Sequence, residues 1–294
     1  MKKKKILLIL KKKHLKESNR EHSSWVYDCS HQYKFDFWGK DITDTSIESL
    51  KAKIDQFKPD YIYMTLRQRY FKFDKKTHEF NDGWLPDLAR INNVPKIFVE
   101  VDSWRWDHAD PWYSQFTELY CRQPQWGNWK NIRHFKWSVL KKNFPTKQYH
   151  RKGINFVGTW KAIAYMNGAF IENVYPQREE ICNSFPEICF SMDKAKHYWE
   201  KLFSSSALVC PKESFIGDFI PIKLFEYLAS GSAVITNCDM DKAGLSSMKP
   251  FVIQYGSIDE LKEKLSVDFS LYHDRAIPLM REHMCEIRYR ELFG

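Results

Sequence analysis

Short apolar runs alternate with stretches of helical periodicity along most of the chain. The apolar runs predict strands at residues 5–10, 59–64, 95–101, 153–158, 207–210 and 233–236. The periodic stretches predict helices at 45–56, 84–92, 165 or 176 to 185, 222–230 and 278–293. Parallel strands need such crossover helices, whereas antiparallel neighbours can be joined by tight turns. The alternation therefore predicts an α/β fold with parallel sheets.

The chain is long enough for two domains. It has 294 residues, and domains usually have roughly 100 to 200. A polar segment at 143–153 is the expected linker. We expect two doubly wound, Rossmann-like domains at 1–148 and 149–275, and a C-terminal helix within 276–294 that packs back on the first domain. Two such domains would face a cleft and bind a ligand at the carboxyl ends of their strands.

Several classes of protein are disfavoured by missing sequence features. No apolar run approaches the roughly 20 residues that span a bilayer. The run at 6–10 is shorter than the roughly 7 to 15 apolar residues of a secretion signal, so we expect a cytoplasmic protein. The seven cysteines include no Cys-x-x-Cys pair, which indicates reduced thiols rather than a disulfide framework or a zinc site. Glycine-rich dinucleotide motifs, P-loops, serine-hydrolase elbows and zincin motifs are missing as well.

The basic residues gather in two parts of the chain. The sequence has 46 Lys and Arg against 37 Asp and Glu, a formal net charge of +9. Residues 2–16 hold eight lysines and no acid, and residues 119–171 hold ten basic residues and no acid. The rest of the chain is net acidic, so the charge is polarised along the sequence. Such a distribution favours a polyanionic partner.

Aromatic residues are interleaved with the second basic stretch. Lysine and arginine bind phosphates and aromatic rings stack on bases, so the combination indicates a nucleic-acid surface. The residues expected to bind a polyanionic acceptor are Lys11, Lys12, Lys13, Trp126 and Trp129. The alternative is a solvated basic face with its aromatic residues in the core, because periodicity does not separate stacking rings from packed ones.

Residues 218–237 carry the strongest local signals. Pro221 suits the first turn of a helix, Gly231 suits its end, and residues 233–236 have the composition of a buried parallel strand. The segment therefore predicts a helix followed directly by a central strand.

The first turn of this helix offers groups that recognise phosphate and ribose. Free N–H groups at a helix start favour a phosphate near residues 219–222. Lys223 adds positive charge there, and Glu226, one turn further on, can accept hydrogen bonds from a ribose. Taken singly, Lys223 and Glu226 are more simply ordinary residues of a helix surface.

Taken together, the segment resembles the donor-binding region of GT-B glycosyltransferases, specifically the retaining group-1 type and its spore-maturation-protein-like relatives. The acid-x7-acid spacing of that family is present as Asp218 and Glu226, within the same helix-Gly-strand order. Residues 153–159 and 175–178 are similar to the opening of the family's C-terminal domain. The likeness is strongest over about residues 134–240.

The resemblance implies a role for each matching residue. Glu226 would hold the donor ribose, Arg178 and Lys223 the diphosphate, and Asp218 the sugar or its surroundings, with Gly158 also at the donor site. Departure of a nucleoside diphosphate builds negative charge, which paired cations stabilise without a metal. The expected co-substrate is a nucleotide sugar, UDP-linked, with no other cofactor. Asp218 stands where the family more often has Glu, and the loop after the first strand is rich in lysine rather than glycine.

Asp102 and His108 follow the strand expected at 95–101 and are the catalytic candidates of the first domain. If transfer inverts the anomeric centre, Asp102 would serve as general base. If transfer retains it, Asp102 or His108 would orient the acceptor or stabilise positive charge on the sugar. A capping aspartate and a structural histidine are the alternatives.

These observations predict an enzyme that moves a sugar from a nucleotide-sugar donor to a hydroxyl acceptor. The expected catalytic residues are Asp102, His108 and Asp218. A hydroxymethylated DNA base is the leading acceptor, because both basic patches are expected to border the cleft. The alternatives are a surface glycan, polymer or protein as acceptor, and a non-catalytic nucleic-acid-binding protein on a degenerate GT-B fold.

Overall fold

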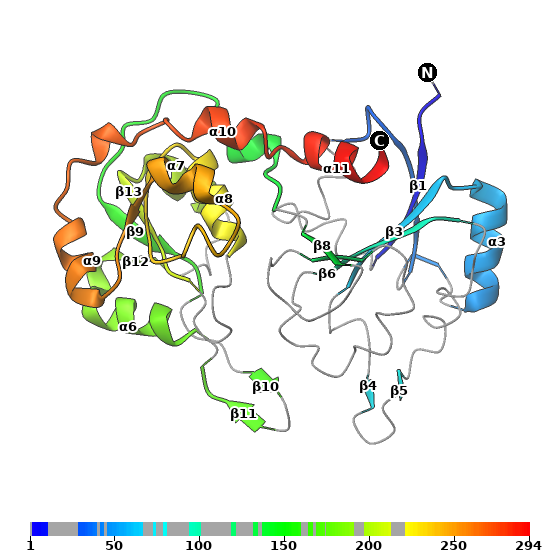
Figure 1. The fold of residues 1–294 in the computed structure, drawn as a ribbon, viewed down its shortest axis with the longest axis horizontal. Coiled ribbons are helices and arrows are strands. Elements are labelled where there is room, and N and C mark those ends of the chain that lie inside the picture. Colours follow the sequence, from blue (N-terminus) through cyan, green and yellow to red (C-terminus); the bar gives the residue numbers. More distant parts are fainter. Residues whose placement is uncertain are drawn as a thin grey trace. The chain divides into compact units, whose positions relative to one another are not determined.

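The computed structural model describes residues 2–10, 29–39, 42–43, 46–66, 73–74, 79–80, 94–100, 119–121, 132–134, 137–159, 164–166, 169–173, 175–190, 197–212 and 221–294. The chain forms two compact units (Figure 1). Unit 1 consists of Met1–Ser138 together with Cys285–Gly294, and unit 2 of Val139–Met284. The sequence placed the corresponding limits at 148 and 275, so unit 2 begins earlier and ends later than expected.

Unit 1 is built on a parallel sheet. Each pair of neighbouring strands is parallel, in the order β2 (Lys34–Trp38), β1 (Lys5–Ile9), β3 (Tyr61–Leu66), β6 (Lys96–Glu100), β7 (Leu119–Cys121) and β8 (Ile132–His134). The strands predicted at 5–10, 59–64 and 95–101 are thereby confirmed. Strands β2, β7 and β8 were not predicted. Charged residues interrupt the apolar pattern of β2 and β8, and β7 has only three residues. A separate antiparallel pair joins β4 (Phe73–Asp74) to β5 (Glu79–Phe80).

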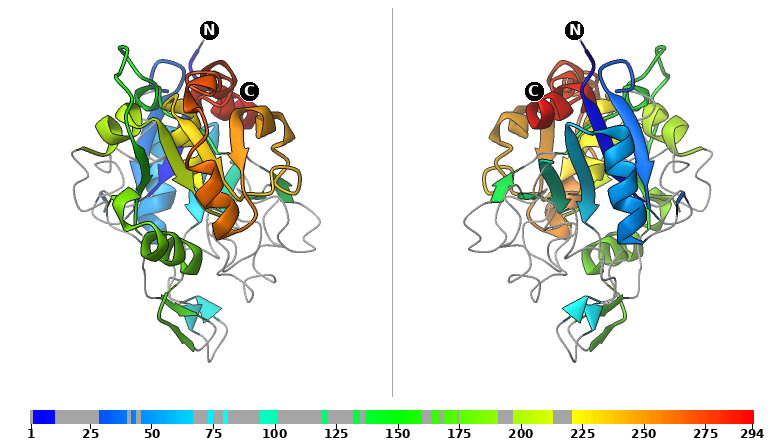
Figure 2. Two further views of the ribbon diagram at one scale, coloured as in Figure 1. Left: turned by 90° about the vertical axis from the view of Figure 1, so that its left-hand side faces the viewer. Right: turned by 90° about the vertical axis from the view of Figure 1, so that its right-hand side faces the viewer.

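Helix α3 (Ile47–Phe57) packs against β1 and β2 on one face of this sheet (Figure 2). The Ser46 hydroxyl accepts a hydrogen bond from the Ser49 backbone N–H and so caps the helix start. The Trp38 indole donates to the Ser49 hydroxyl at 2.9 Å, which fixes the end of β2 against the helix. The helix predicted at 45–56 is confirmed.

The C-terminal helix α11 (Cys285–Phe293) belongs to unit 1. Its Phe293 ring contacts Tyr33, Tyr61 and Tyr63, at centroid distances of 5.5, 5.3 and 6.1 Å. Aromatic rings bury large apolar areas, so these contacts hold the chain end against the strands of unit 1.

The single helix predicted at 278–293 is wrong. The structure has α10 (Ile277–Arg281) in unit 2, a break, and then α11. The break is held by tertiary contacts: the Val139 backbone N–H donates to the His283 carbonyl at 2.9 Å, and the His283 ring contacts Phe225 edge-on. The amphipathic pattern is therefore continuous in the sequence, but its first part packs in unit 2 and its second part packs in unit 1.

Unit 2 has a second parallel sheet. Its strand order is β12 (Cys189–Phe190), β9 (Ile154–Val157), β13 (Ala207–Cys210), β14 (Ala233–Thr236) and β15 (Val252–Gln254). The strands predicted at 153–158, 207–210 and 233–236 are confirmed. Strands β13 and β14 are buried along their whole length, as parallel strands covered on both faces are.

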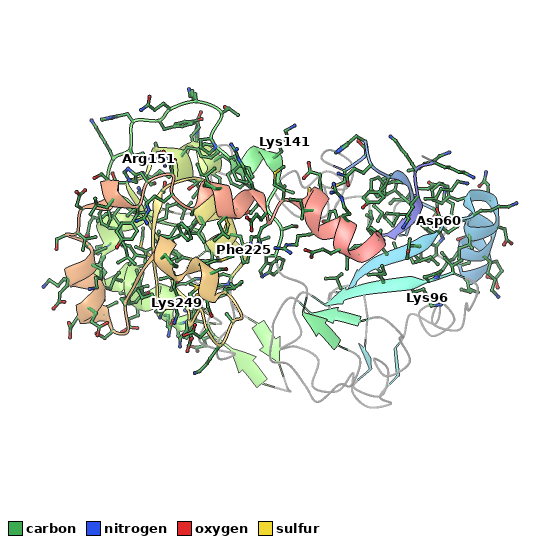
Figure 3. The ribbon with its side chains drawn as sticks, turned by 45° about the horizontal axis from the view of Figure 1, so that its top comes forward. Asp60, Lys96, Lys141, Arg151, Phe225 and Lys249 are labelled. Atoms are coloured by element: carbon green, nitrogen blue, oxygen red, sulfur yellow. A yellow bond between two sulfur atoms is a disulfide. The ribbon has the colours of Figure 1, made fainter. Side chains whose placement is uncertain are left out.

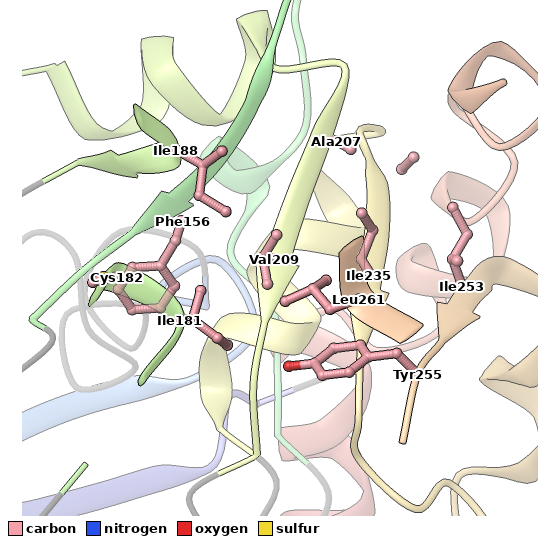
Figure 4. Packing of buried hydrophobic residues seen from close by; sticks show 11 residues of the cluster. Phe156, Ile181, Cys182, Ile188, Ala207, Val209, Ile235, Ile253, Tyr255 and Leu261 are labelled. Atoms are coloured by element: carbon pink, nitrogen blue, oxygen red, sulfur yellow. The ribbon is translucent and has the colours of Figure 1, made fainter. Parts of the chain in front are cut away.

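Helices cover both faces of the unit 2 sheet. Ala207, Val209 and Ile235 pack against α6 (Pro176–Ser184) and α9 (Ile258–Lys264), in the core drawn in Figure 4. The opposite face contacts α7 (Tyr198–Ser204) and α8 (Ile222–Ala229). Side chains alternate between the faces of a strand, so one apolar strand supplies both cores. Short 3-10 turns complete the chain at Lys141–Asn143, Pro186–Ile188, Ser246–Phe251 and Phe269–Leu271.

Two features of unit 2 correct the sequence interpretation. Tyr165 lies in the hairpin of β10 (Ala164–Met166) and β11 (Ala169–Ile171), so the predicted helix begins at Pro176 and not at 165. Cys182 and Cys189 form a disulfide between α6 and β12, although all cysteines were expected to be reduced. The α6 turn brings these two thiols together, which their spacing in the sequence does not indicate.

Arg151 ties together three parts of unit 2, and we expect its loss to destabilise this unit (Figure 3). Its guanidinium donates to the carbonyls of Phe203 and Ser230, to the Ser232 hydroxyl, and to Asp274 at 2.6 Å. Arg151→Ala leaves these acceptors unpaired, and we expect it to lower the free energy of unfolding by about 2 to 3 kcal/mol. Chemical denaturation measures the change.

Asp274→Asn is the matched control, because the Asp274 side chain is 58% exposed and a surface ion pair contributes roughly 1 kcal/mol or less. Equal losses from Arg151→Ala and Asp274→Asn would mean that the ion pair, and not the carbonyl contacts, holds these segments.

Candidate functional site

The candidate site lies at the carboxyl ends of β9 and β13 in unit 2. The chain runs from β9 to β12 on one side and then to β13 on the other, so the strand order reverses between β9 and β13. In doubly wound sheets, ligands bind outside the carboxyl ends of the strands at such a switch point. The residues that follow β9 and the first turns of α6 and α8 are therefore the first place to look for ligand-binding groups.

Gly158 ends β9 and lets a lysine from α8 approach the backbone. A Cβ added at Gly158 would lie 1.8 Å from the Nζ of Lys223, so only glycine leaves room for the ammonium group. The same ammonium lies 5.6 Å from the Phe156 ring centroid. Within the part of the chain that the structure describes, no hydrogen-bond acceptor is paired with this Nζ. Lys223 is thus held at the strand end with its charge available to a ligand.

Arg178 brings a second cation to the same strand end. It lies in the first turn of α6, which Pro176 begins, and only 5% of its surface is exposed. Its guanidinium donates to the Thr159 carbonyl at 3.0 Å and lies 3.8 Å from the Tyr175 ring centroid, a cation–π contact. Both contacts orient the guanidinium beside the residues that follow β9.

Glu226 lies one turn after Lys223 on α8 and is 8% exposed, which differs from the helix-surface acid that the sequence suggested. The Tyr198 hydroxyl, from α7, donates to its Oε2 at 2.6 Å. The neighbouring Tyr227 hydroxyl donates to the Val157 carbonyl at 2.6 Å and anchors α8 to the end of β9. Two buried tyrosines therefore position the carboxylate and the helix that carries it.

Burial and mutual repulsion set the charge of this cluster. Burial, with the nearby charge of Arg178, lowers the pKa of Lys223 from 10.5 to about 7. Burial also lowers the pKa of Arg178, although a guanidinium stays charged at neutral pH. Burial raises the pKa of the Cys210 thiol at the end of β13, which keeps that thiol protonated. Among the residues that the structure describes here, Arg178 and Lys223 place two cations near the single carboxylate of Glu226, a balance that favours an anionic ligand.

This arrangement suits a ligand that carries both phosphate and hydroxyl groups. A diphosphate would supply the missing negative charge and would raise the pKa of Lys223 back towards its ordinary value. A carboxylate such as Glu226 has about four lone-pair sites, so it can accept several hydrogen bonds besides the one from Tyr198. Charge-assisted hydrogen bonds of this kind are about twice as strong as neutral ones.

The structure brings together the four residues expected to bind the donor: Gly158, Arg178, Lys223 and Glu226. The other expected site residues lie outside the described residues, namely Asp102, His108, Asp218, Lys11, Lys12, Lys13, Trp126 and Trp129. Sequence reasoning missed Tyr198, Tyr227 and Cys210. Tyr198 lies on a seven-residue helix without a clear periodic pattern, and only its burial against Glu226 identifies it.

Gly158→Ala is expected to weaken ligand binding more than folding. The new methyl group would displace the Lys223 ammonium, which sits at the end of a flexible side chain and can move away. We therefore expect the affinity for a nucleoside diphosphate to fall at least about tenfold, with a melting temperature within a few degrees of the parent.

Gly153→Ala is the control for this prediction. It also introduces a methyl group at a glycine with positive φ, but no atom lies within 4 Å of the added carbon. Calorimetry measures the affinity of both variants for the nucleoside diphosphate, and thermal unfolding measures their melting temperatures. Equal affinities for the two variants would show that Gly158 does not position Lys223.

Comparison with known proteins gives structural but not sequence matches. The sequence matches no protein-family model and none of the curated proteins. The fold is similar to that of sucrose-phosphate synthase from Thermosynechococcus elongatus, with a TM-score of 0.58, 11% identity and 99% of each chain covered. It is also similar to AviGT4, a glycosyltransferase involved in avilamycin A biosynthesis, with a TM-score of 0.51, 11% identity, and 98% of this chain and 96% of that one covered.

These similarities concern the fold. They confirm the α/β class with two Rossmann-like domains, the GT-B fold that the sequence predicted. The narrower likeness to the spore-maturation-protein branch stays a prediction. Among the described residues, no helix is long and apolar enough to cross a membrane. The same residues contain no group of three or more His, Cys, Asp or Glu that could hold a metal ion.

Proposed function

We propose that this protein is a glycosyltransferase that takes a sugar from a nucleotide-sugar donor bound by unit 2. The observation that carries the proposal is the pair of cations, Arg178 and Lys223, gathered at the end of β9 with a buried carboxylate, Glu226, one helical turn away. Similarity in fold to a sucrose-phosphate synthase and to a glycosyltransferase supports it.

The proposed reaction breaks the bond between the anomeric carbon and the diphosphate, and forms a bond from that carbon to an acceptor hydroxyl oxygen. The hydroxyl proton passes to a base, for which Asp102 is the proposed group if the transfer inverts the anomeric centre, or to the departing diphosphate if it retains it. Negative charge grows on the diphosphate as its bond breaks. Arg178 and Lys223 stabilise this charge, an effect that is large in a partly desolvated site because little solvent screens it. Glu226, oriented by Tyr198, accepts hydrogen bonds from the ribose and so fixes the donor.

The acceptor and the details of the chemistry stay predictions. Asp102, His108 and Asp218 are the proposed groups near the reacting carbon, and a UDP-linked sugar is the proposed donor. A hydroxymethylated DNA base is a proposed acceptor whose binding residues lie outside the described part of the chain, and neither structural comparison supports it. A surface glycan, polymer or protein is the other proposed acceptor class, and a cytoplasmic location is likewise a proposal.

A thermal-shift screen of UDP-, GDP-, dTDP- and ADP-linked sugars tests the donor proposal. A ligand at 100 times its Kd adds about 2.7 kcal/mol of stability, and one donor class should produce that shift. Release of nucleoside diphosphate from the same donor separates an enzyme from a non-catalytic binding protein. The proposal fails if no nucleotide sugar shifts the melting temperature of the parent protein.

Glu226→Gln identifies the ribose contact within that screen. Glutamine keeps the size of the side chain and can still accept from the Tyr198 hydroxyl, so the fold should hold. We expect the affinity for the donor to fall by at least about tenfold, because hydrogen bonds to a charged group contribute roughly 1.5 to 3 kcal/mol each. The 2′- and 3′-deoxynucleotides should bind the parent more weakly than the ribonucleotide does. The variant should bind the deoxynucleotides and the ribonucleotide with equal affinity. Equal discrimination by both proteins would reject the contact.

A further inference from the structure

Unit 1 has a hollow that the proposed donor site does not use. It lies where β1 and β2 begin, at the opposite edge of the sheet from the carboxyl ends of these strands. Its volume is about 610 Å³, within the range of roughly 300 to 1,000 Å³ that is usual for ligand sites. Four lysines line it, together with two phenylalanines of β2: Lys2, Lys3, Lys5, Lys34, Phe35 and Phe37.

The lysines of this hollow lack acidic counter-charges. None of the described residues that line it is Asp or Glu. Lys3 and Lys5 donate to the backbone carbonyls of Ser30 and Phe57, at 3.2 and 2.8 Å, and these contacts leave their charge uncompensated.

Two described carboxylates lie on residues next to the lining, and both already have partners. Asp36 is paired with Lys53 of α3 at 2.7 Å, and Asp60 accepts from the Lys5 backbone N–H. Four lysines lining one hollow attract an anion, and a bound phosphate group would supply a counter-charge.

Phe35 and Phe37 add apolar ring surface to the same hollow. They are separated by one residue on β2, so both side chains point to the same face of the sheet. This is the face that carries Tyr61 and Tyr63, since the strand register pairs Ile6 with both Phe35 and Tyr61. Both phenylalanines are partly exposed at the outer strand of the sheet, and the Phe35 ring also contacts that of Tyr33 at a centroid distance of 6.0 Å.

The combination of charge and ring surface identifies a class of ligand. Phosphate groups suit the lysines, and bases stack on phenylalanine, a contact that tolerates any base sequence. A lipid surface fits less well, because the rings line a hollow and do not protrude as interfacial anchors do. We propose that this hollow binds a single-stranded nucleic acid, with the lysines on its phosphates and Phe35 and Phe37 against its bases. The proposal is independent of the donor site in unit 2.

Fluorescence anisotropy with a fluorescein-labelled oligothymidylate tests the proposal across a salt series. The test variant replaces Lys2, Lys3 and Lys34 by serine. The control replaces Lys51, Lys152 and Lys262 by serine, which are three exposed lysines elsewhere. Both variants lose three positive charges. Any oligonucleotide binding that depends only on the net charge of the protein should therefore weaken equally in both. The difference between them therefore reports on the hollow.

We expect the Lys2/Lys3/Lys34 variant to bind at least tenfold more weakly than the control. The slope of log affinity against log salt should fall by about 2, since each phosphate contact on a single strand contributes about 0.7. Phe37→Leu keeps apolar volume but removes the ring. It should weaken oligothymidylate binding at least about fivefold while leaving competition by inorganic tripolyphosphate unchanged.

Three outcomes would overturn the proposal. The first is equal loss of affinity in the two triple-serine variants. The second is a Phe37→Leu variant that binds the oligothymidylate as the parent does, because charge alone would then explain binding. The third is binding to phosphatidylserine vesicles without binding to the oligothymidylate at low salt, which would assign the hollow to a membrane surface. The lysine variants change exposed side chains, so their folding can be checked by thermal unfolding before binding is measured.

Discussion

Lys223→Met is expected to lower turnover by about 100- to 1,000-fold and at the same time to raise the stability of the fold. The loss of rate follows from the proposed role, because removing one group that stabilises transition-state charge has effects of this size. The gain in stability follows from the depressed pKa of Lys223, which burial and Arg178 lower to about 7. The same residue would then be needed for activity and unfavourable for folding.

The sign of the stability effect comes from proton binding. Below about pH 7 the lysine is protonated in both states and its cost to the fold is largest. Between pH 7 and about 10 the unfolded chain keeps a proton that the folded chain has lost, so the free energy of unfolding rises with pH in that range. The penalty shrinks as pH rises towards the ordinary lysine pKa. We expect a gain of about 1 to 2 kcal/mol for methionine at pH 7.5, because the substitution removes a charge that the fold desolvates and keeps an apolar side chain of similar length.

Two measurements and one control test this pair of effects. Single-turnover release of nucleoside diphosphate measures the rate, and chemical denaturation measures the free energy of unfolding. Lys262→Met is the control, because it removes an exposed lysine of α9. It should change neither the turnover nor the free energy of unfolding. Turnover within threefold of the parent would reject the role of Lys223 in the reaction. A stability loss would show instead that its ammonium group is well compensated in the folded protein.

Donor affinity is expected to fall as pH rises above 7. Only the protonated form of Lys223 attracts the diphosphate, and its pKa of about 7 in the free protein means that this form becomes scarce at higher pH. The Kd for a nucleoside diphosphate should rise about tenfold for each pH unit between roughly 8 and 9, with uptake of about one proton on binding. The second phosphate ionisation, near pH 6, is complete in this range and adds no slope.

Lys223→Arg separates this effect from other titrations. Arginine stays charged, so the affinity of the variant should be nearly flat from pH 7 to 9. Calorimetry in two buffers of different ionisation enthalpy counts the proton directly. An equally steep pH dependence in the arginine variant would assign the titration to a different group.

The local pattern of unit 2 was readable from the sequence. Residues 207–210 and 233–236 are short, largely apolar runs bounded by serine, proline or asparagine, and such runs form buried parallel strands. The helix between them starts after Pro221 and is followed by Gly231, signals that act within a few residues. The four residues proposed to bind the donor were selected from local spacing as well, through the resemblance to a family motif, and their role stays a prediction.

What the sequence determined, then, is the α/β class and the order of the main strands and helices. It also singled out Gly158, Arg178, Lys223 and Glu226 as a set, which the structure brings together and whose role stays a prediction. These follow from signals shorter than about one helix or strand, and they do not depend on how distant segments meet. The short strands β7 and β8 and the break before α11 were not accessible in this way. Strands β7 and β8 form because they pair with neighbouring strands. The helix is interrupted before α11 because tertiary contacts fix the residues at the break.

Only the tertiary structure decided the chemical state of the site. The hydrogen bond from Tyr198 to Glu226 joins helices 28 residues apart in the chain, and the approach of Lys223 to Gly158 joins α8 to the end of β9. Burial arises from such long-range packing, so the sequence could name a lysine but could not show that its pKa lies near 7. The hollow lined by Lys34 and Phe35 has the same origin, since β2 becomes the outer strand of the sheet only by pairing with β1.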